Sequence, residues 1–507
     1  MDLQKRFSKL PDIDYPNFRF LFDDITQKFE ALPVFRIRAP EAADSNLIHG
    51  NKFNYNACSY GDLRQKSYAL GRFLLAQGLE KQDKVLLLGD SHPEWCFSYI
   101  AALVAGLVIV PLDPAMDADS VAGLLKASGA RALVFSHAMH GKLADIMARY
   151  KELSLQLKVL VEFGLDSSTE ASSEKTLAAA FKTISFNEAV NSVAAKAGDH
   201  EGLPEPDSIN GDGPASIIYT SGTTGIAKGI MLSHRGIIAN INASIQALNV
   251  SPSDRFIAVL PLHHTYASTC NFLAPITAGG SITFTEKIVP SLVVKHIKES
   301  GVTVLIGVPL LFDKIKQGIR TEMDKLKGIK AVFVKTMFSA SAFITNSFGI
   351  RAGAMLLKFL RIKAGIASIR LGVAGGGPLS WDTAQFFEIL GLNLVQGYGM
   401  SENGPLISVN LPEYKDNHSV GLPVKKTLVR IADSGSDGVG EIQVKSPSMM
   451  LGYMDAEAEN EAIFSQDGWL RTGDLGYMDK RGFVYITGRS KNLIVTEGAK
   501  NVYPEEI

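Results

Sequence analysis

The chain has few cysteines and no long apolar segment. Its 507 residues include three cysteines, Cys58, Cys96 and Cys270, without the close spacing of metal or redox sites. This excludes a disulfide framework and favours a reducing compartment. The longest apolar run, residues 99–112, has the length of a buried helix plus a strand, short of a bilayer span. Residues 1–15 lack the apolar core of a signal peptide, so we expect a cytoplasmic protein.

The chain also has little net charge. The formal value is -1 at pH 7, which gives no reason to expect a nucleic-acid partner. The charges are unevenly placed, because residues 314–370 hold twelve lysines and arginines but only two acids, Glu322 and Asp324. Within this stretch, residues 351–363 (RAGAMLLKFLRIK) predict a basic amphipathic helix that can lie peripherally on an anionic membrane surface. The alternative is an ordinary surface helix with one solvated face.

The length and the pattern of elements predict several subdomains. A chain of 507 residues exceeds one ordinary core. Strands predicted at residues 84–88, 108–111 and 131–135 alternate with helices at 59–78 and 94–105, which indicates a doubly wound parallel sheet. A second α/β pattern runs from residue 255 to about 404. The fold class is therefore α/β, with two doubly wound α/β subdomains.

Short strands follow the second α/β pattern and predict a small β-barrel-like subdomain. They are expected at residues 428–431, 440–444, 468–471 and 482–487. Residues 166–175 form a polar loop, and residues 198–213, rich in Gly, Pro and Asp, form a linker. The expected domains are residues 1–212, 213–419, 420–489 and a final segment, 490–507.

A loop rich in glycine and hydroxyl groups is the most informative motif. Residues 219–235 read YTSGTTGIAKGIMLSHR and follow a predicted strand, residues 215–219. Two glycines let backbone N–H groups converge, and four hydroxyls and Lys228 add further donors, which suits a polyphosphate. The GxxxxGK[ST] spacing of a P-loop is absent, and residues 229–232 predict a strand where a P-loop has a helix. The loop residues are Thr220, Ser221, Gly222, Thr223, Thr224 and Gly225.

This segment resembles the signature loop of the adenylate-forming superfamily, which comprises acyl-CoA synthetases, adenylation domains and luciferases. The usual form has proline before the lysine, where this chain has Ala227. The phosphate-binding donors are nevertheless all present. A serine- and threonine-rich surface turn is the alternative for this segment taken alone.

Residues 261–267 (PLHHTYA) resemble the second core motif of the superfamily. They follow a predicted strand, residues 256–260, and the match places His264 beside the substrate carboxylate, with His263 as a spacer. No Asp or Glu occurs from residue 255 to residue 285, so the ammonium group of an amino-acid substrate would lack a partner. Ala267 and Ser268 leave room for an apolar tail. A purely structural histidine is the alternative.

Two further motifs resemble the adenine-binding segments of the superfamily. In residues 370–380 (RLGVAGGGPLS), the resemblance places a loop against adenine that consists of Gly375, Gly376, Gly377 and Pro378. In residues 395–402 (VQGYGMSE), it implies that Tyr398 stacks on adenine and that Glu402, together with Thr220, holds Mg²⁺. The same motif contributes Gln396, Gly397, Gly399 and Ser401, the last in place of the usual threonine.

The ribose-binding residues complete the set. In residues 467–474 (DGWLRTGD), Asp474 matches the carboxylate that accepts both ribose hydroxyls. Arg489 matches the arginine that contacts ribose or phosphate. The resemblance covers residues 55–507 and is closest to long-chain fatty acyl-CoA synthetases. The basic stretch, the acid-free second motif and residues 491–507 support this subgroup.

The resemblance implies a ligase that forms acid–thiol bonds, with ATP, Mg²⁺ and CoA and a fatty acid as substrate. Lys228, Glu402 and His264 are the expected catalytic residues. Family members continue beyond the point matching Ile507 with a small mobile domain that carries a catalytic lysine, so we expect residues 490–507 to be the hinge and start of that domain, and turnover to be impaired. The alternatives are an enzyme with another carboxylate or a carrier-protein acceptor, and a non-catalytic nucleotide- or lipid-binding module.

Overall fold

The computed structural model describes residues 10–38, 55–165, 183–194, 201–220, 227–490, 494–495 and 501–502. The predicted polar loop of residues 166–175 lies outside these ranges. So does most of the predicted hinge segment, residues 490–507, in which only two short strands are described, β22 (Ile494–Val495) and β23 (Asn501–Val502).

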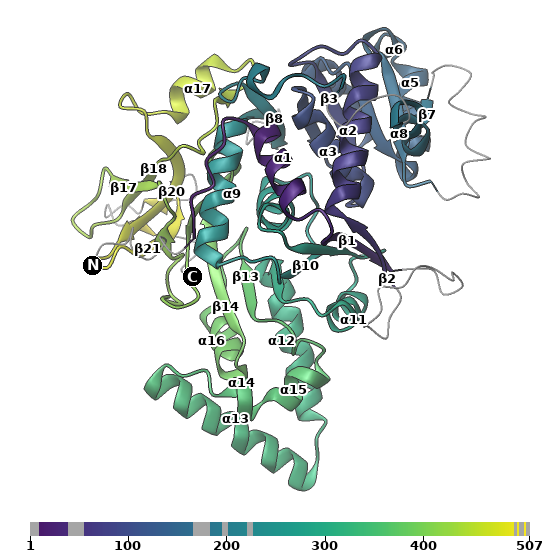
Figure 1. The fold of residues 1–507 in the computed structure, drawn as a ribbon. Coiled ribbons are helices and arrows are strands. Elements are labelled where there is room, and N and C mark those ends of the chain that lie inside the picture. The colour runs from purple at the N-terminus through teal and green to yellow at the C-terminus, as the bar shows by residue number, and fades with distance from the viewer. Residues whose placement is uncertain are drawn as a thin grey trace.

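The largest sheet has eight strands in the order β19-β9-β8-β4-β3-β5-β6-β7 (Figure 1). The strands from β8 to β7 are parallel, and β9 and β19 run antiparallel at one edge. This confirms the predicted parallel strands. The bounds are β3 (Lys84–Leu88), β4 (Val108–Leu112), β5 (Ala132–Ser136), β6 (Val159–Phe163), β7 (Thr183–Ser185), β8 (Pro214–Thr220), β9 (Lys228–Ser233) and β19 (Gly452–Tyr453).

Helices cover both faces of this sheet, which explains its apolar strands. Successive side chains of a strand point to opposite faces. Accordingly, Val85 and Leu87 pack in one core with α2 (Tyr60–Ala76), α3 (Pro93–Val104) and α8 (Phe186–Ala194). Leu86 and Leu88 pack in another with α4 (Ala118–Ser128) and α5 (His140–Arg149), near the short α6 (Leu153–Gln156). As predicted, α2 is capped by Ser59 and Asp62, each side chain accepting a hydrogen bond from the other's backbone N–H.

A second sheet joins distant parts of the chain. Its order is β10-β11-β1-β2, with β1 (Pro33–Arg38), β2 (Tyr55–Ser59), β10 (Arg255–Ala258) and β11 (Ser281–Phe284). The predicted domain division at residues 212 and 213 stays a prediction, but the sheets cross it. Strands β1 and β2 lie with β10 and β11, whereas β8 and β9 lie with β3 to β7. Helices α1 (Phe18–Lys28), α9 (His234–Leu248), α10 (Ala274–Thr277) and α11 (Pro290–Ser300) pack around these sheets, and a π-helix spans Ala267–Leu273.

The third sheet carries the predicted adenine-binding motifs. It has the order β12-β13-β14-β15-β16, in which β12 (Val304–Gly307), β13 (Leu371–Ala374) and β14 (Asn393–Gly399) are parallel. Strands β15 (Leu406–Val409) and β16 (Leu422–Pro423) are antiparallel, and α16 (Trp381–Leu390) lies between β13 and β14 in the chain. The glycine loop therefore follows the carboxyl end of β13, where ligands bind in parallel sheets.

A small antiparallel sheet follows, as the short predicted strands indicated. Its order is β17-β18-β20-β21, with β17 (Leu428–Ala432), β18 (Gly440–Lys445), β20 (Leu470–Met478) and β21 (Val484–Arg489), and α17 (Glu457–Ile463) precedes β20.

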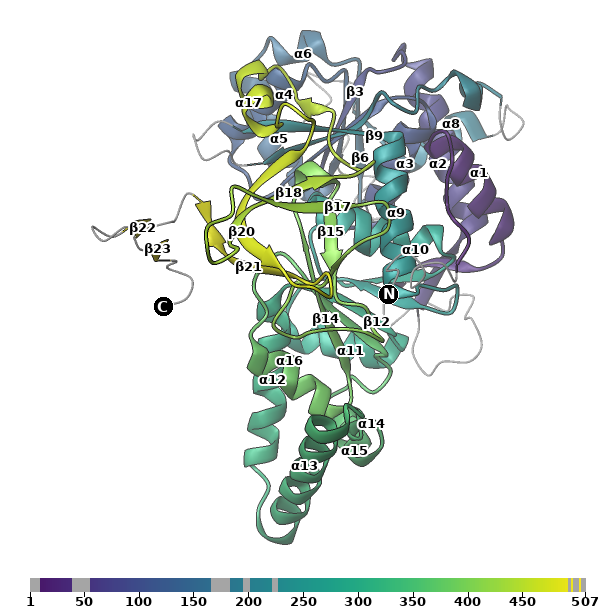
Figure 2. The ribbon, with the colours of Figure 1, turned by 90° about the vertical axis from the view of Figure 1, so that its left-hand side faces the viewer.

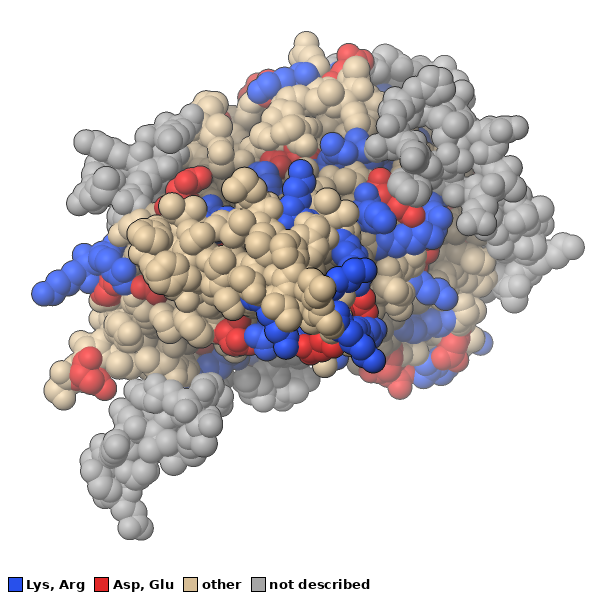
Figure 3. Space-filling model, turned by 90° about the horizontal axis from the view of Figure 1, so that it is seen from below, with Lys and Arg blue, Asp and Glu red and all other residues tan. Residues whose placement is uncertain are grey.

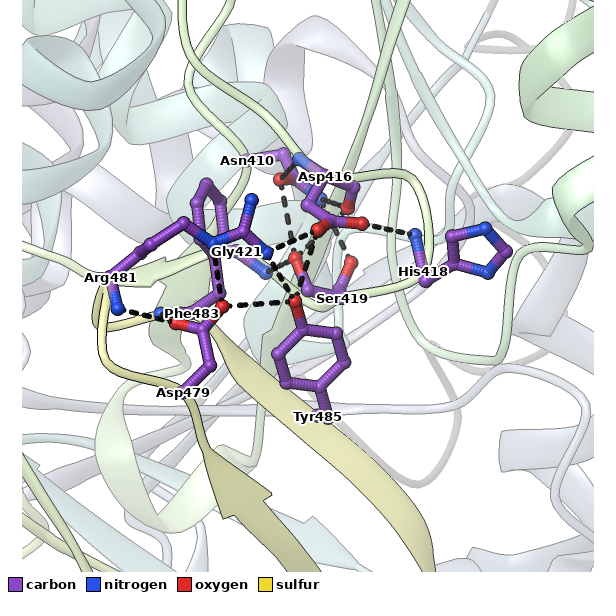
Figure 4. Close-up of polar contacts among 9 residues, drawn as sticks. All are labelled: Asn410, Asp416, His418, Ser419, Gly421, Asp479, Arg481, Phe483 and Tyr485. Atoms are coloured by element: carbon purple, nitrogen blue, oxygen red, sulfur yellow. Dashed lines mark hydrogen bonds and ion pairs between the residues drawn. The ribbon is translucent and has the colours of Figure 1, made fainter.

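A polar network fixes this sheet against the loop between β15 and β16 (Figure 4). The carboxylate of Asp416 accepts hydrogen bonds from Arg481 at 2.7 Å and from Tyr485 at 3.0 Å. The Asn410 side chain donates to the carbonyl oxygen of Ser419 at 2.9 Å. Burial and the neighbouring Asp416 raise the pKa of Tyr485, so its hydroxyl stays a donor. The hairpin β20–β21 is therefore held close to β14 and β15.

A helical projection extends from the body of the molecule. It contains α12 (Pro309–Asp324), α13 (Gly328–Phe348), α14 (Gly353–Leu356) and α15 (Lys358–Lys363), at the lower end in Figures 1 and 2. The prediction of one amphipathic helix over residues 351–363 is wrong, because this stretch forms two short helices. Gly353 lies against the backbone of Ile389, where a Cβ would come within 2.0 Å of the carbonyl oxygen, and Leu357 between the two helices is fully buried. These contacts fix the bend.

Candidate active site

The strands on either side of the glycine- and serine-rich loop form a hairpin. Thr220 ends β8 and pairs with Lys228, which begins β9. The strand predicted after Lys228, instead of the helix of a P-loop, is confirmed. The loop itself lies outside the described residues, so the phosphate-binding roles of the following residues stay predictions: Ser221, Gly222, Thr223, Thr224 and Gly225.

A tyrosine connects the predicted catalytic lysine with the predicted metal-binding carboxylate. The Lys228 ammonium lies 5.3 Å from the centre of the Tyr453 ring and 3.5 Å from an oxygen of Glu459. The Tyr453 hydroxyl donates to Glu402 Oε1 at 2.7 Å. Burial and the adjacent Glu402 carboxylate raise the pKa of Tyr453, which keeps this hydroxyl protonated. The structure therefore brings Lys228 and Glu402 together around a residue that the sequence did not single out.

A buried asparagine pair holds the segment that carries Glu402. Glu402 lies in a 3₁₀ turn (Ser401–Asn403), and its carbonyl oxygen accepts from the Met450 backbone at 2.8 Å. Asn240 of α9 donates to the carbonyl oxygens of Asn403 and Leu406, both at 3.1 Å, and accepts from the Leu406 backbone at 3.2 Å. Since Asn240 and Asn403 are both buried, these hydrogen bonds fix the turn against α9.

The second core motif, residues 261–267, lies against the two predicted adenine-binding motifs. The Thr265 hydroxyl donates to the Ser401 hydroxyl at 2.8 Å, and the Tyr266 hydroxyl donates to the carbonyl oxygen of Val373 at 3.4 Å. A Cβ on Gly375 would lie 2.9 Å from the Tyr266 ring, so a residue without a side chain is required there. Residues 261–267 therefore adjoin both adenine-binding motifs.

The two histidines of this motif differ in exposure. His264 is exposed, whereas His263, expected to be a spacer, is buried, with its Nε2 3.9 Å from Asp113 Oδ1. The ring centres lie 4.1 Å apart. Burial lowers the pKa of His263 to about 4 and also lowers the pKa of His264, so both rings are neutral at pH 7. The substrate-side role of His264 stays a prediction.

The predicted adenine and ribose residues are in direct contact. The buried Tyr398 donates through its hydroxyl to Asp474 Oδ2 at 2.7 Å, and Arg489 Nε lies 3.2 Å from Asp474 Oδ1. Asp474 on β20 pairs with Arg489 on β21 and is 8% exposed. Burial, with the neighbouring carboxylate, raises the pKa of Tyr398 well above its ordinary value. One carboxylate thus joins the third sheet to the small antiparallel sheet.

The remaining predicted residues lie on the same elements. Gln396, Gly397 and Gly399 are on β14 beside Tyr398. Gly376 and Pro378 are exposed just after β13, with Gly377 half-buried between them. This leaves backbone accessible next to Tyr266 and Gly375, as a flat ring would require.

The donor set fits a hard divalent cation. Carboxylate and hydroxyl oxygens, as in Glu402 and Thr220, are the ligands that Mg²⁺ prefers beside substrate phosphates. Glu402 Oε1 accepts a hydrogen bond from Tyr453, whereas Oε2 accepts none from the other described residues. A carboxylate oxygen is therefore left for a cation or for bound water.

Sequence reasoning missed four residues of this site: Tyr453, Thr265, Tyr266 and Asn240. Each acts through a contact with a residue distant in sequence, for example 51 positions for Tyr453 and Glu402. No local spacing could have indicated them. A mostly apolar cavity of about 490 Å³ also escaped prediction; it lies apart from these residues, between α11, α12 and α15.

Comparison with known proteins agrees with this arrangement. The pattern of the family described as "AMP-binding enzyme" matches residues 36–454. A long-chain-fatty-acid–CoA ligase of Yersinia pestis is 30% identical over 475 residues, covering 89% of this chain and 75% of that protein. The long-chain-fatty-acid–CoA ligase heimdall of Drosophila melanogaster is 26% identical, covering 100% of this chain and 74% of that protein.

Solved structures show the same fold. ATP-bound MatB from Rhodopseudomonas palustris superposes with a TM-score of 0.70 at 24% identity, covering 97% of this chain and 82% of that one. The anthranilate CoA ligase AuaEII, in complex with anthranoyl-AMP, gives a TM-score of 0.72 at 18% identity, covering 99% and 81%. The family match, the relatives and the shared fold together show that the chain belongs to the AMP-binding enzymes, within the adenylate-forming superfamily of acyl-CoA ligases.

Proposed function

We propose that this protein is a long-chain-fatty-acid–CoA ligase that activates its acid as an acyl-adenylate. The observation that carries the proposal is the assembly of Lys228, Glu402 and Asp474 through two tyrosine hydroxyls, Tyr453 and Tyr398. The names of the relatives, long-chain-fatty-acid–CoA ligases, support the substrate class. The acid-free second motif agrees with a substrate that has a carboxylate and an apolar tail.

In the first step, a carboxylate oxygen of the fatty acid attacks the α-phosphorus of ATP, and the bond to pyrophosphate breaks. Asp474 accepts the ribose hydroxyls, and Tyr398, held by its hydrogen bond to Asp474, lies against adenine. Lys228, fixed over the Tyr453 ring, places positive charge beside the phosphates, where charge develops. Glu402 and Thr220 would hold Mg²⁺, which supplies further neutralisation of the phosphate charge when bound.

In the second step, the CoA thiolate attacks the carbonyl carbon of the acyl-adenylate and AMP leaves. His264 is exposed and neutral. Its ring N–H can therefore donate a hydrogen bond to the acyl carboxylate or carbonyl oxygen, and the ring does not form an ion pair. The proposal includes a cytoplasmic location and peripheral contact with a membrane through residues 314–370, because long-chain fatty acids partition into membranes.

Acid-dependent exchange of pyrophosphate into ATP, measured on the protein together with the C-terminal domain that the resemblance implies, tests the proposal. We expect exchange with long-chain fatty acids, weaker exchange with medium-chain acids and none with amino acids. Glu402→Gln should lower it by about 100-fold or more, since it weakens both the Tyr453 contact and the cation site. Glu413→Gln, a glutamate outside the site, is the matched control.

Two results would contradict the proposal in different ways. Exchange that depends on an aromatic or amino acid would identify another acid-activating enzyme. ATP binding in a calorimeter without exchange for any acid would identify a nucleotide-binding module.

A further inference from the structure

The outward face of α13 is apolar, although it is open to solvent. Five large side chains are between 56% and 89% exposed: Ile329, Val332, Phe333, Phe343 and Phe348. The buried positions of the helix include two hydroxyl residues, Ser341 and Thr345. A surface helix of a globular protein normally has the reverse arrangement. The exposed face therefore has the chemistry of a surface that is covered by something apolar.

The apolar surface extends beyond α13. Ile350, Met355, Phe359 and Ile362, which follow α13 in the chain, are also at least 40% exposed. Viewed from below, this end of the molecule is a broad surface of uncharged side chains, and its margins carry lysines and arginines together with some acidic residues (Figure 3).

The chain segment that carries this surface has charges of one sign. No Asp or Glu occurs from residue 325 to residue 381. Lys327, Lys330, Lys335 and Lys358 are exposed, and among the described residues no ion pair involves them. Apolar side chains with unpaired lysines beside them complement the acyl and headgroup layers of an anionic membrane.

The inward face of α13 is packed on the body of the protein. By length and composition, α13 is the one helix of the described part that could cross a bilayer. Its other side, however, is packed on α16: the rings of Phe338 and Phe386 lie 5.7 Å apart, and the Ser341 hydroxyl donates to the carbonyl oxygen of Ile389 at 2.6 Å. Crossing the bilayer would break this packing, whereas lying in its interface would not.

We infer that α13 lies in the plane of an anionic membrane, with its apolar face in the acyl boundary and its lysines among the headgroups. This deepens the proposed function, because it would place the enzyme where a long-chain fatty acid dissolves. The binding surface itself contains none of the predicted active-site residues, so membrane binding and catalysis can be measured separately.

Vesicle flotation of the purified protein tests the inference. We expect binding to phosphatidylcholine vesicles that contain phosphatidylglycerol, and much weaker binding to phosphatidylcholine alone. Phe333→Ser with Phe343→Ser should abolish flotation, whereas Leu155→Ser, at a 90% exposed leucine elsewhere, should leave it unchanged. Lys330→Gln with Lys335→Gln should weaken binding to anionic vesicles about 30-fold at low salt, because each lysine contributes roughly fivefold. Lys126→Gln, in the remote helix α4, is the charge control.

The outcomes separate this inference from the proposed function. Pyrophosphate exchange with a detergent-solubilised fatty acid should be unchanged in the phenylalanine variants. Failure of the wild-type protein to float on anionic vesicles would overturn the inference while leaving the ligase activity intact. Flotation that persists in the phenylalanine variants, or self-association that they abolish, would also overturn it, the latter by identifying a second copy as the occupant.

A second, independent observation is a cluster of two histidines and a buried glutamate. His137 Nδ1 and His140 Nδ1 lie 2.6 Å and 3.1 Å from Glu162 Oε1, and the ligand atoms of all three residues lie within 4.8 Å of one another. His137 follows β5, His140 begins α5, and Glu162 lies near the end of β6. In the sheet, β3 and β4 separate these strands from β8, so the cluster is remote from Lys228.

The buried carboxylate is the unusual member of this cluster. Glu162 is 3% exposed, and within the described ranges its ion-pair partners are these two histidines. A carboxylate removed from water is costly unless cationic or metallic charge compensates it. Two imidazole nitrogens and one carboxylate oxygen are the ligand set of zinc sites that keep one open position.

We propose that His137, His140 and Glu162 bind a divalent transition metal, Zn²⁺ in the first instance. Calorimetric titration of ZnCl₂ into protein treated with a chelator should show one equivalent bound. His137→Ala, at a partly exposed position, should weaken binding at least about tenfold, and so should His140→Ala. His418→Ala, at an exposed histidine elsewhere, should not. Absence of zinc binding, or equal binding by His137→Ala, would overturn the proposal.

Discussion

Asp474 gives the sharpest test of the nucleotide site. Oδ2 of Asp474 accepts from Tyr398, and Oδ1 lies beside Arg489. We expect each of these two carboxylate oxygens also to accept a hydrogen bond from a ribose hydroxyl. A hydrogen bond to a charged acceptor contributes about 1.5–3 kcal/mol. Two ribose hydroxyls are therefore worth roughly 3–6 kcal/mol, so the wild-type protein should bind ATP about 150-fold to 20,000-fold more tightly than 2′,3′-dideoxy-ATP.

A double-mutant cycle isolates this contribution. In Asp474→Ala, the preference for ATP over the dideoxy nucleotide should fall to within about threefold, since the acceptor of both hydroxyls is gone. Calorimetric titration measures the affinities of the wild-type protein and of Asp474→Ala for ATP and for the dideoxy nucleotide. Because the change also leaves the buried Tyr398 hydroxyl unpaired, we expect stability to fall by about 1–3 kcal/mol in urea unfolding, so binding is measured well below the transition.

The same motif offers a matched control. Asp467 is exposed and pairs with Arg430, away from Tyr398, so Asp467→Ala should keep the discrimination between the two nucleotides. If Asp474→Ala discriminated as strongly as the wild-type protein, or if Asp467→Ala lost discrimination equally, the assignment of the ribose site would be refuted.

Three further changes test other parts of the structure. Tyr453→Phe should lower pyrophosphate exchange roughly 10-fold to 150-fold, since Glu402 loses a charged hydrogen bond; Tyr477→Phe is the control, and equal rates would contradict the role. Burial lowers the pKa of His234, whose ring nitrogens have no hydrogen-bond partner among the described residues, to about 4. The unfolded chain binds the proton first, so His234 should cost about 2 kcal/mol of stability on going from about pH 7.5 to 5; urea unfolding of His234→Leu should show a smaller loss, and an equal loss would exclude His234 as the cause. Asn240→Ala should lower the free energy of urea unfolding by about 3 kcal/mol, because it leaves buried carbonyl groups unpaired; a loss under about 1 kcal/mol would show that the network is not needed.

Patterns among neighbouring residues predicted much of the fold. The strand at residues 84–88 and the cap at Ser59 are encoded by neighbouring residues, apolar side chains in one case and a serine and an aspartate three positions apart in the other. The prediction of one helix over residues 351–363 was wrong because Gly353 packs on the backbone of Ile389. This contact joins residues far apart in the chain, so the local sequence does not indicate it. For the same reason, the strong apolar character of α13 gave no indication of which side is exposed.

The motifs were likewise readable one by one, because each ligand contact needs particular residue types at short spacing. Sequence alone determined the α/β class, the adenylate-forming family and the identity of residues such as Lys228, Glu402 and Asp474. Only the tertiary structure decided that Tyr453 joins two of them, that Asn240 holds the turn of Glu402, and that the apolar face of α13 points outward. These are contacts between elements far apart in the chain, set by the packing of four sheets and a helical projection, and no short segment of sequence specifies them.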